Sequence, residues 1–447
     1  MSRQRQAQRP AASLPQQASG PPSAEWEVAA LVPGGDGLAR LEDGRIAFVP
    51  GGLPGDRIRP LRVQDRRTYL RALSWKLVQA SPERVTPPCP VADACGGCDW
   101  MHLERSAQLR EKAALLGQAL TRTGKFDRLP AAPAVTSHGP NERYRNRLRL
   151  HVDAQGRLGL FARRSHELVA IDDCLVGPEA TRQVLAVLRE LGAAHPGSLA
   201  SFGEVELRVA PTDPRIALTL RPRELAGTPA PASERLVRAL AEHFVVSVVG
   251  RPTPAACEQR WPLVEGVDLA VPVEAFVQVN WSVNVELVRR VVSGARRRNL
   301  RSFCDLYCGA GNFALPLLAA GLQGTAIDHD PASVPAAERT ARRAGWSSGT
   351  FIAADVLSGL RKVHRRGERF DLLVLDPPRS GARALLDTIA DLEPRHVAIC
   401  ACDPVTLARD ARRLVDRGFD LEELGGLDMF PHTHHFEVLA WLRGPAR

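Results

Sequence analysis

Short apolar runs alternate with helical patterns through the C-terminal third of the chain. The runs at Arg301–Leu306, Gly324–Ile327, Thr350–Ala353 and Phe370–Leu375 have the length of strands, and segments of helical periodicity separate them. This order is typical of a parallel, doubly wound sheet. We therefore expect an α/β domain that binds ligands at the carboxyl ends of its strands.

A different pattern occupies the N-terminal part of the chain, from Glu25 to about Leu77. Short apolar runs recur there, and glycine-containing turns separate them. Strands with turn signals at intervals of about 8–12 residues predict a small antiparallel barrel. A small barrel rich in basic residues is a common RNA-binding platform. Its second half contains Arg57, Arg59, Arg62, Arg66, Arg67 and Arg71.

The middle of the chain mixes strand and helix patterns. Tyr144–Leu150 alternates like a strand with arginines on one face, and Leu158–Phe161 has the pattern of its hairpin partner. Helices are expected at Leu103–Thr121 and Glu179–Leu191, where apolar residues share one face. We therefore expect an α+β domain. An RNA-facing surface and a solvated strand face explain the arginines equally well.

These patterns divide the chain into four parts. Residues 1–23 are rich in Gln, Ala, Pro, Ser and Arg and predict a disordered basic tail. The barrel is expected at 24–80, the central domain at 81–265 and the doubly wound domain at 266–447. Because the sequence contains no long apolar run and no apolar signal core, we expect a cytoplasmic protein without a membrane span.

Basic residues exceed acidic ones, and the formal net charge is +9. Only four of the 59 basic residues are lysines, and the other 55 are arginines. Arginine forms bidentate contacts with phosphates and stacks on bases, so this excess suits a polyanionic partner. A compositional bias of the source genome explains the excess of arginine equally well, because Ala, Gly and Pro are also abundant.

Three of the nine cysteines lie close together in a loop rich in proline and glycine. Cys89, Cys95 and Cys98 have the spacing C-x5-C-x2-C, and Cys174 is the nearest candidate for a fourth thiolate. Disulfides are not expected in a cytoplasmic chain, so this cluster indicates a metal site. By ligand count alone, zinc and a 4Fe-4S cluster are both compatible with it.

A cysteine stands at a predicted strand-to-helix corner near the end of the chain. An apolar run ends at Cys402, and Asp403 and Pro404 are typical of an N-cap and a first helical position. The positive end of a helix dipole stabilises a thiolate, so we expect Cys402 to be nucleophilic at neutral pH. The alternative is a cysteine that only packs at the end of a strand.

A glycine turn follows the first strand of the doubly wound domain. Gly309 and Gly311 let a ligand approach the backbone, and Asp328 follows at the end of the second strand, where a carboxylate can bind ribose hydroxyls. Asn312 after the turn, without a third glycine, favours S-adenosylmethionine over NAD. Asp355 and Asp376 end later strands at the same edge. A solvated loop carboxylate is the alternative for Asp355.

Five motifs follow one another along the chain: Phe276–Asn280, Asp305–Phe313, Asp376–Arg379, Cys402–Asp410 and Phe430–Glu437. With these motifs in this order, the chain resembles the S-adenosylmethionine-dependent RNA uracil-5-methyltransferases. Its barrel and cysteines are similar to the cluster-containing branch, which carries an N-terminal TRAM domain and acts on 23S ribosomal RNA. The resemblance covers roughly residues 25–447 and implies a Rossmann-like class I methyltransferase domain.

This resemblance assigns roles to individual residues. Cys402 matches the family's nucleophile, which adds to carbon 6 of uracil, and Glu437 matches the base that removes the proton from carbon 5. Two further sets follow from the family. The positions that contact S-adenosylmethionine are Gln278, Tyr307, Asn312, Asp328, Asp355 and Asp376, and the ligands of a 4Fe-4S cluster are Cys89, Cys95, Cys98 and Cys174.

Several features separate this chain from the commonest family pattern. Asp328 stands where glutamate is usual, and Ala401 where serine is frequent. Cys400 is expected to pack in the core, and His432, His434 and His435 to organise the loop before Glu437. The resemblance implies a monomer that modifies 23S ribosomal RNA. The same chemistry on transfer RNA is the alternative, and a nonenzymatic RNA-binding factor is a weaker one.

Overall fold

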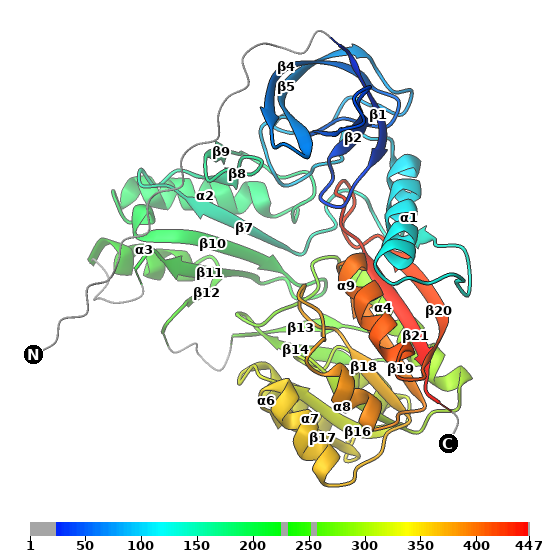
Figure 1. Ribbon diagram of the computed structural model, residues 1–447. Coiled ribbons are helices and arrows are strands. Elements are labelled where there is room, and N and C mark those ends of the chain that lie inside the picture. Colours follow the sequence, from blue (N-terminus) through cyan, green and yellow to red (C-terminus); the bar gives the residue numbers. More distant parts are fainter. Residues whose placement is uncertain (1–23, 225–230, 252–256, 446–447) are drawn as a thin grey trace, which may run out of the picture. The chain divides into compact units, whose positions relative to one another are not determined.

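The computed structural model describes residues 24–224, 231–251 and 257–445 (Figure 1). The chain divides into two compact units, one ending at Arg84 and the other beginning at Val85. The basic tail predicted at residues 1–23 lies outside the described residues.

The first unit is a closed five-stranded barrel, as the spacing of its turns predicts (Figure 1, blue). Its neighbouring strands pair antiparallel except β3 and β5, which are parallel, so the prediction of a wholly antiparallel barrel is wrong at this one pair. Trp26, Val28 and Ile58 are buried in its core. The strands are β1 (Trp26–Leu31), β2 (Gly37–Arg40), β3 (Ile46–Val49), β4 (Arg57–Asp65) and β5 (Tyr69–Gln79).

The second unit contains a six-stranded sheet in the order β12-β11-β10-β7-β8-β9. Alternate residues of β7 are buried, so its arginines Arg147 and Arg149 share the other face, as the sequence predicts. Leucines of α2 and α3 pack against the buried face. The elements are β7 (Arg147–Val152), β8 (Leu158–Phe161), β9 (Leu168–Ala170), α2 (Thr181–Ala194), the 3-10 helix η1 (Leu199–Ser201), β10 (Phe202–Val209), β11 (Ile216–Pro222), α3 (Pro231–Ala241) and β12 (Val245–Val248).

An eight-stranded sheet forms the rest of the second unit, in the order β17-β16-β15-β18-β19-β21-β20-β6. The first five of these strands are parallel, as predicted, and β21 pairs antiparallel with β19 and β20. Its elements are α4 (Trp281–Arg297), β15 (Ser302–Leu306), α5 (Ala314–Ala319), β16 (Gln323–Asp328), α6 (Ser333–Arg343), β17 (Gly349–Ala353), α7 (Val356–Arg365), β18 (Leu372–Leu375), α8 (Leu386–Asp391), β19 (His396–Ala401), α9 (Pro404–Val415), β20 (Asp420–Leu427) and β21 (Glu437–Arg443).

Close packing on this sheet explains one glycine in a helix. A Cβ atom on Gly294 of α4 would lie 2.4 Å from Cζ2 of Trp441 on β21, so a larger residue would push the helix off the sheet. Every residue of β18 and of β19 is buried. The α/β fold class expected from the sequence is therefore confirmed, together with the N-terminal barrel.

Two elements from the middle of the sequence join the C-terminal sheet. The edge strand β6 (Val135–Thr136) pairs parallel with β20, and α1 (Arg105–Arg122) packs beside α9. Both lie in the range predicted for the central domain, so residues 81–265 do not fold apart from the sheet.

A two-stranded ribbon, β13 (Glu258–Pro262) with β14 (Asp268–Pro272), precedes α4. None of the helices in the described residues is long and apolar enough to span a membrane.

Candidate active site

The glycine turn after β15 lies at the carboxyl edge of the parallel strands. Gly309 and Gly311 both have positive φ angles, +51° and +92°, and a Cβ atom on Gly311 would lie 2.6 Å from Cγ of Leu315. Tyr307 also has a positive φ of 68°, which is uncommon for a residue with a side chain. The turn therefore holds a strained backbone at the edge where a doubly wound sheet binds ligands.

The structure places the predicted cofactor residues around this turn. Asp328 is buried and accepts a hydrogen bond of 2.8 Å from the Gly309 amide, so it holds the turn in place. Asn312 exchanges two side-chain hydrogen bonds with Asn284 of α4. Asp355 is exposed and caps α7 by accepting from the Ser358 amide at 2.9 Å. These contacts give each side chain a structural role, and carboxylates retain lone pairs for a ligand.

A second pair of predicted residues meets at the end of β18. The side-chain amide of Gln278 donates to Oδ2 of Asp376 at 2.9 Å, and the main-chain carbonyl of Gln278 accepts from Asn146 at 2.7 Å. Gln278 is thus held from both sides, and it comes from the segment just before α4. The structure therefore brings together two residues that lie 98 positions apart in the chain.

The corner at Cys402 has the local structure that its sequence predicts. β19 ends at Ala401, and Asp403 caps α9 by accepting from the amides of Val405 and Thr406, each at 2.8 Å. Pro404 occupies the first turn of the helix. Cys400 is fully buried, in agreement with its expected packing role, whereas Cys402 is only half-buried.

Strand register brings Glu437 next to Cys402. β21 runs antiparallel to β19 with Val438 opposite Ala401, so the next position on each chain is Glu437 and Cys402. The Glu437 side chain is 3% exposed, and among the described residues its Oε2 atom has no hydrogen-bond partner. A buried carboxylate oxygen without a partner is costly, and it is typical of a group that serves a reaction.

Burial and charge together set the ionisation of this site. Burial, together with the charges on Glu437 and Asp376, raises the pKa of Cys402 to about 11, and Arg379 opposes this shift. Burial also raises the pKa of Asp376 to about 6, against the hydrogen bond from Gln278. Burial, followed by the charge on Asp376, holds the pKa of Glu437 well above its ordinary value.

The prediction that the α9 dipole makes Cys402 a thiolate at neutral pH is therefore wrong for the protein without its ligands. The sequence around Cys402 shows the helix but not the two carboxylates that reach the thiol from β18 and β21. Two like charges and burial outweigh one helix terminus, whose effect is about 0.3–1 kcal/mol at most exposed sites.

Arg379 is a site residue to which the sequence assigned no role. The positive charge of its guanidinium lowers the pKa of the Cys402 thiol, and it also lowers the pKa of Glu437. The same guanidinium lies 3.4 Å from Nε2 of His435. Burial lowers the pKa of His435 to about 3, so its ring is neutral and Nε2 can accept from arginine. The signal in the sequence is a cation three residues after Asp376.

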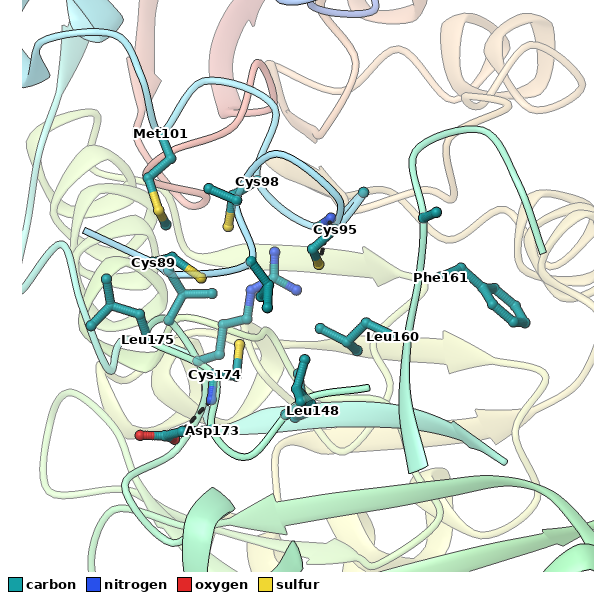
Figure 2. Close-up of a pocket in the computed structure, with 18 of the residues that line it drawn as sticks. Cys89, Cys95, Cys98, Met101, Leu148, Leu160, Phe161, Asp173, Cys174 and Leu175 are labelled. Atoms are coloured by element: carbon teal, nitrogen blue, oxygen red, sulfur yellow. Dashed lines mark hydrogen bonds between the residues drawn. The ribbon is translucent and has the colours of Figure 1, made fainter. Parts of the chain in front are cut away.

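The four predicted ligand cysteines surround one cavity of about 330 Å³. Figure 2 shows Cys89, Cys95 and Cys98 on one side of it and Cys174 facing them from the other. The Arg145 side chain also lines the cavity and opposes the effect of burial, which raises the pKa of Cys98 to about 12. Among the described residues, no three His, Cys, Asp or Glu side chains could hold a single metal ion.

Fold and site together define a methyltransferase-like doubly wound domain with a cysteine and a carboxylate at its ligand-binding edge. No family model matches the chain. The 23S rRNA (uracil(1939)-C(5))-methyltransferase RlmD of Edwardsiella ictaluri is 32% identical over 92% of this chain and 94% of its own length. The enzyme of the same name from Pseudomonas putida is 34% identical over 93% and 92%. The protein therefore belongs to the RNA uracil-C5 methyltransferase family.

A solved structure agrees with this assignment at the level of the fold. The tRNA (uracil-54, C5)-methyltransferase of Pyrococcus abyssi, in complex with S-adenosyl-L-homocysteine, superposes with a TM-score of 0.70. The similarity covers 93% of this chain and all of that one, with 24% sequence identity.

Proposed function

We propose that this protein transfers a methyl group from S-adenosylmethionine to carbon 5 of a uridine in 23S ribosomal RNA. One observation carries the proposal: the register of β19 and β21 sets Cys402 beside Glu437 at the ligand-binding edge of the sheet. A nucleophile and a base side by side are what methylation of an unreactive carbon requires. The names of the relatives supply the substrate, and the proposed cofactor residues surround the turn after β15.

The proposed reaction begins with addition of Cys402 to the uracil ring. Its thiolate forms a bond to carbon 6, and the electrons of the double bond between carbons 5 and 6 move onto the oxygen of carbon 4 as an enolate. Carbon 5 then attacks the methyl group of S-adenosylmethionine, the bond from this methyl group to sulfur breaks, and neutral S-adenosylhomocysteine is the leaving group. Glu437 takes the proton from carbon 5, the ring double bond re-forms, and the bond from carbon 6 to sulfur breaks. The uridine must leave its stack to reach Cys402.

Both acidic groups need help to ionise. Burial raises the pKa values of the Cys402 thiol and of Glu437, and so favours the protonated form of each group. A positive charge nearby favours the ionised forms, and the sulfonium of S-adenosylmethionine brings one into the site. Arg379 acts in the same direction on both groups. In this proposal, cofactor binding activates the nucleophile and the base together.

We further propose that Cys89, Cys95, Cys98 and Cys174 hold a 4Fe-4S cluster. In such a cluster each thiolate binds a different iron, so the sulfurs lie farther apart than around a single zinc ion. A cavity of about 330 Å³ ringed by four cysteines, without a group that fits one ion among the described residues, suits the larger cofactor. The guanidinium of Arg145 would offset the negative charge of the thiolates.

The remaining parts of the chain fit this proposal as RNA-binding elements. We assign the barrel at 24–80 as a TRAM domain, residues 81–265 as the cluster domain and 266–447 as the methyltransferase domain of a monomer. The tail at 1–23 is proposed to add nonspecific attraction to RNA, since it contains three arginines.

Mapping of 5-methyluridine in RNA from a strain that lacks the gene tests the proposed substrate. We expect one or more sites in 23S ribosomal RNA to lose the methyl group and to regain it when the wild-type gene is restored, but not with Cys402→Ala. Loss of 5-methyluridine from transfer RNA instead would favour the alternative substrate. Unchanged methylation of both RNAs would contradict the proposal.

A further inference from the structure

The loop before Glu437 lies between the cysteine cavity and the active site. The Trp100 amide donates to the His432 carbonyl at 2.9 Å, and the His432 amide donates to Oε1 of Gln108 at 2.9 Å. Tyr144, which precedes the cavity residue Arg145, donates through its hydroxyl to the Pro431 carbonyl at 3.1 Å. Residues that follow or precede the proposed cluster ligands in sequence therefore hold the main chain of this catalytic loop (residues 428–436).

One side-chain contact joins the two loops more specifically. Asp99 follows Cys98 directly, and its Oδ1 atom accepts from the His434 amide at 3.1 Å. Its Oδ2 atom is hydrogen-bonded to Nδ1 of the His434 ring. Because both carboxylate oxygens are engaged with one histidine, the rotation of that ring is fixed from the side of the cysteines.

The fixed ring is the first of a series of contacts that ends at Arg379, the cation that acts on Cys402. The His434 ring lies over the His435 ring, with 3.9 Å between the centroids. His435 accepts from the Arg379 guanidinium through Nε2 at 3.4 Å. Arg379 is exposed, and its positive charge lowers the pKa of the Cys402 thiol. Because an exposed arginine has many rotamers, a partner is needed to hold its guanidinium near the sulfur.

We propose that Asp99 and His434 are positioning residues that hold Arg379 against Cys402. Asp99 fixes the orientation of the His434 ring, and this ring packs against the His435 ring and restrains it. His435 in turn holds the Arg379 guanidinium beside the Cys402 sulfur. The conformation of the cysteine loop is thereby coupled to the reactivity of a thiol on the far side of the catalytic loop. The inference rests on the proposed function only in taking Cys402 as the nucleophile.

The test measures the reactivity of Cys402 without RNA or cofactor. Full-length protein, purified without oxygen, is treated with iodoacetamide, and mass spectrometry quantifies the label at Cys402 in the tryptic peptide 396–409. In Asp99→Asn we expect labelling at pH 8 to slow about three- to tenfold, since a displaced cation raises the thiol pKa by about 0.5–1 unit. His434→Gln should slow the labelling of Cys402 to a similar extent. This variant replaces Asp99→Asn in the test if Asp99→Asn does not fold.

A double-mutant cycle separates positioning from general loosening of the fold. If Asp99 acts through Arg379, Asp99→Asn should have no further effect in an Arg379→Gln background. Asp173→Asn is the matched control, because Asp173 adjoins the ligand candidate Cys174 but pairs with Arg143 at 2.6 Å. This control should leave the labelling of Cys402 unchanged.

Three results would overturn the inference. The first is labelling of Cys402 within twofold of wild type in folded Asp99→Asn and His434→Gln. The second is that Asp99→Asn slows the labelling by the same factor in the wild-type and Arg379→Gln backgrounds. The third is that the control Asp173→Asn slows the labelling as much as Asp99→Asn does. None of these results depends on methyl transfer. Loss of methyl transfer to every RNA tested, with the coupling intact, would count against the proposed function alone.

Discussion

Glu437 is buried, lies near the carboxylate of Asp376, and has one side-chain oxygen without a hydrogen-bond partner in the described part of the chain. These features decide when Glu437 carries a charge. Burial raises its pKa well above the ordinary value, and the charge on Asp376 raises it further. In the empty site the raised pKa favours the protonated form of such a group, and a cation that arrives lowers the pKa and so makes the carboxylate available as a base. Its isosteric amide keeps the shape of the site and removes only proton transfer.

Glu437→Gln should therefore trap the covalent adduct. After methyl transfer the proton on carbon 5 cannot leave, so Cys402 stays bonded to the RNA. With radiolabelled RNA and S-adenosylmethionine, we expect a protein–RNA band that survives a denaturing gel. The double variant Cys402→Ala/Glu437→Gln provides the control and should give no such band. Absence of the band from folded Glu437→Gln would remove Glu437 from the role of base.

The Cys402 thiol should show its raised pKa directly. With a pKa of about 11, the thiolate fraction rises about tenfold for each pH unit between 7 and 10, and alkylation of Cys402 should follow it. We expect a nonhydrolysable analogue of S-adenosylmethionine that carries a positive charge to shift this profile to lower pH. A profile that levels off near pH 8 in the free protein would show that burial does not control this thiol.

At the scale of elements, the catalytic loop is anchored by helix α1. Lys112 is fully buried and pairs with Asp428, and its ammonium also donates to the Phe430 carbonyl at 3.0 Å. Asp428 has a second cation, because Arg105 from the first turn of α1 pairs with it as well. The carboxylate of Asp428 therefore stabilises the charged form of the buried Lys112.

The two halves of this ion pair should differ in their effect on stability. Asp428→Asn leaves Lys112 buried without a counterion and should cost about 3–5 kcal/mol. Lys112→Met leaves Asp428 with Arg105 and should cost less. Thermal unfolding of the variants checks the order, with Arg122→Met on the exposed end of α1 as a control near wild type. Equal losses for Asp428→Asn and Lys112→Met would show that Arg105 does not compensate.

The elements themselves could be predicted from the sequence, whereas their long-range pairing could not. The four predicted strands of the C-terminal domain agree with β15 to β18 within two residues at each end, because periodicity and turn residues are local signals. The pairing of β6 with β20, the buried contact of Lys112 with Asp428 and the contact of Asp99 with His434 join residues about 290 to 335 positions apart. No pattern within a short window of sequence reports such contacts.

At the scale of the whole molecule, the candidate site also has features that local sequence predicts and features that depend on distant contacts. Motifs identified Cys402, Glu437, Gln278 and Asp376, since each motif carries its residue at a fixed offset. The ionisation of Cys402 was predicted in the wrong direction, because it depends on carboxylates from other strands. The role of Arg379 depends on His435, 56 residues away. Chemistry that arises from several elements needs the fold before it can be predicted.

The proposed cluster joins distant parts of the chain and so concerns the whole second unit. Cys174 lies 76 residues after Cys98, and a cofactor that binds both would close this long segment and stabilise the cavity that Figure 2 shows. Protein purified without oxygen should be brown and contain about four irons per chain. Cys174→Ser should lose most of the iron and unfold at a lower temperature. Cys257→Ser should keep both properties, because Cys257 is buried outside the cavity. A colourless protein with one zinc ion per chain would contradict the assignment.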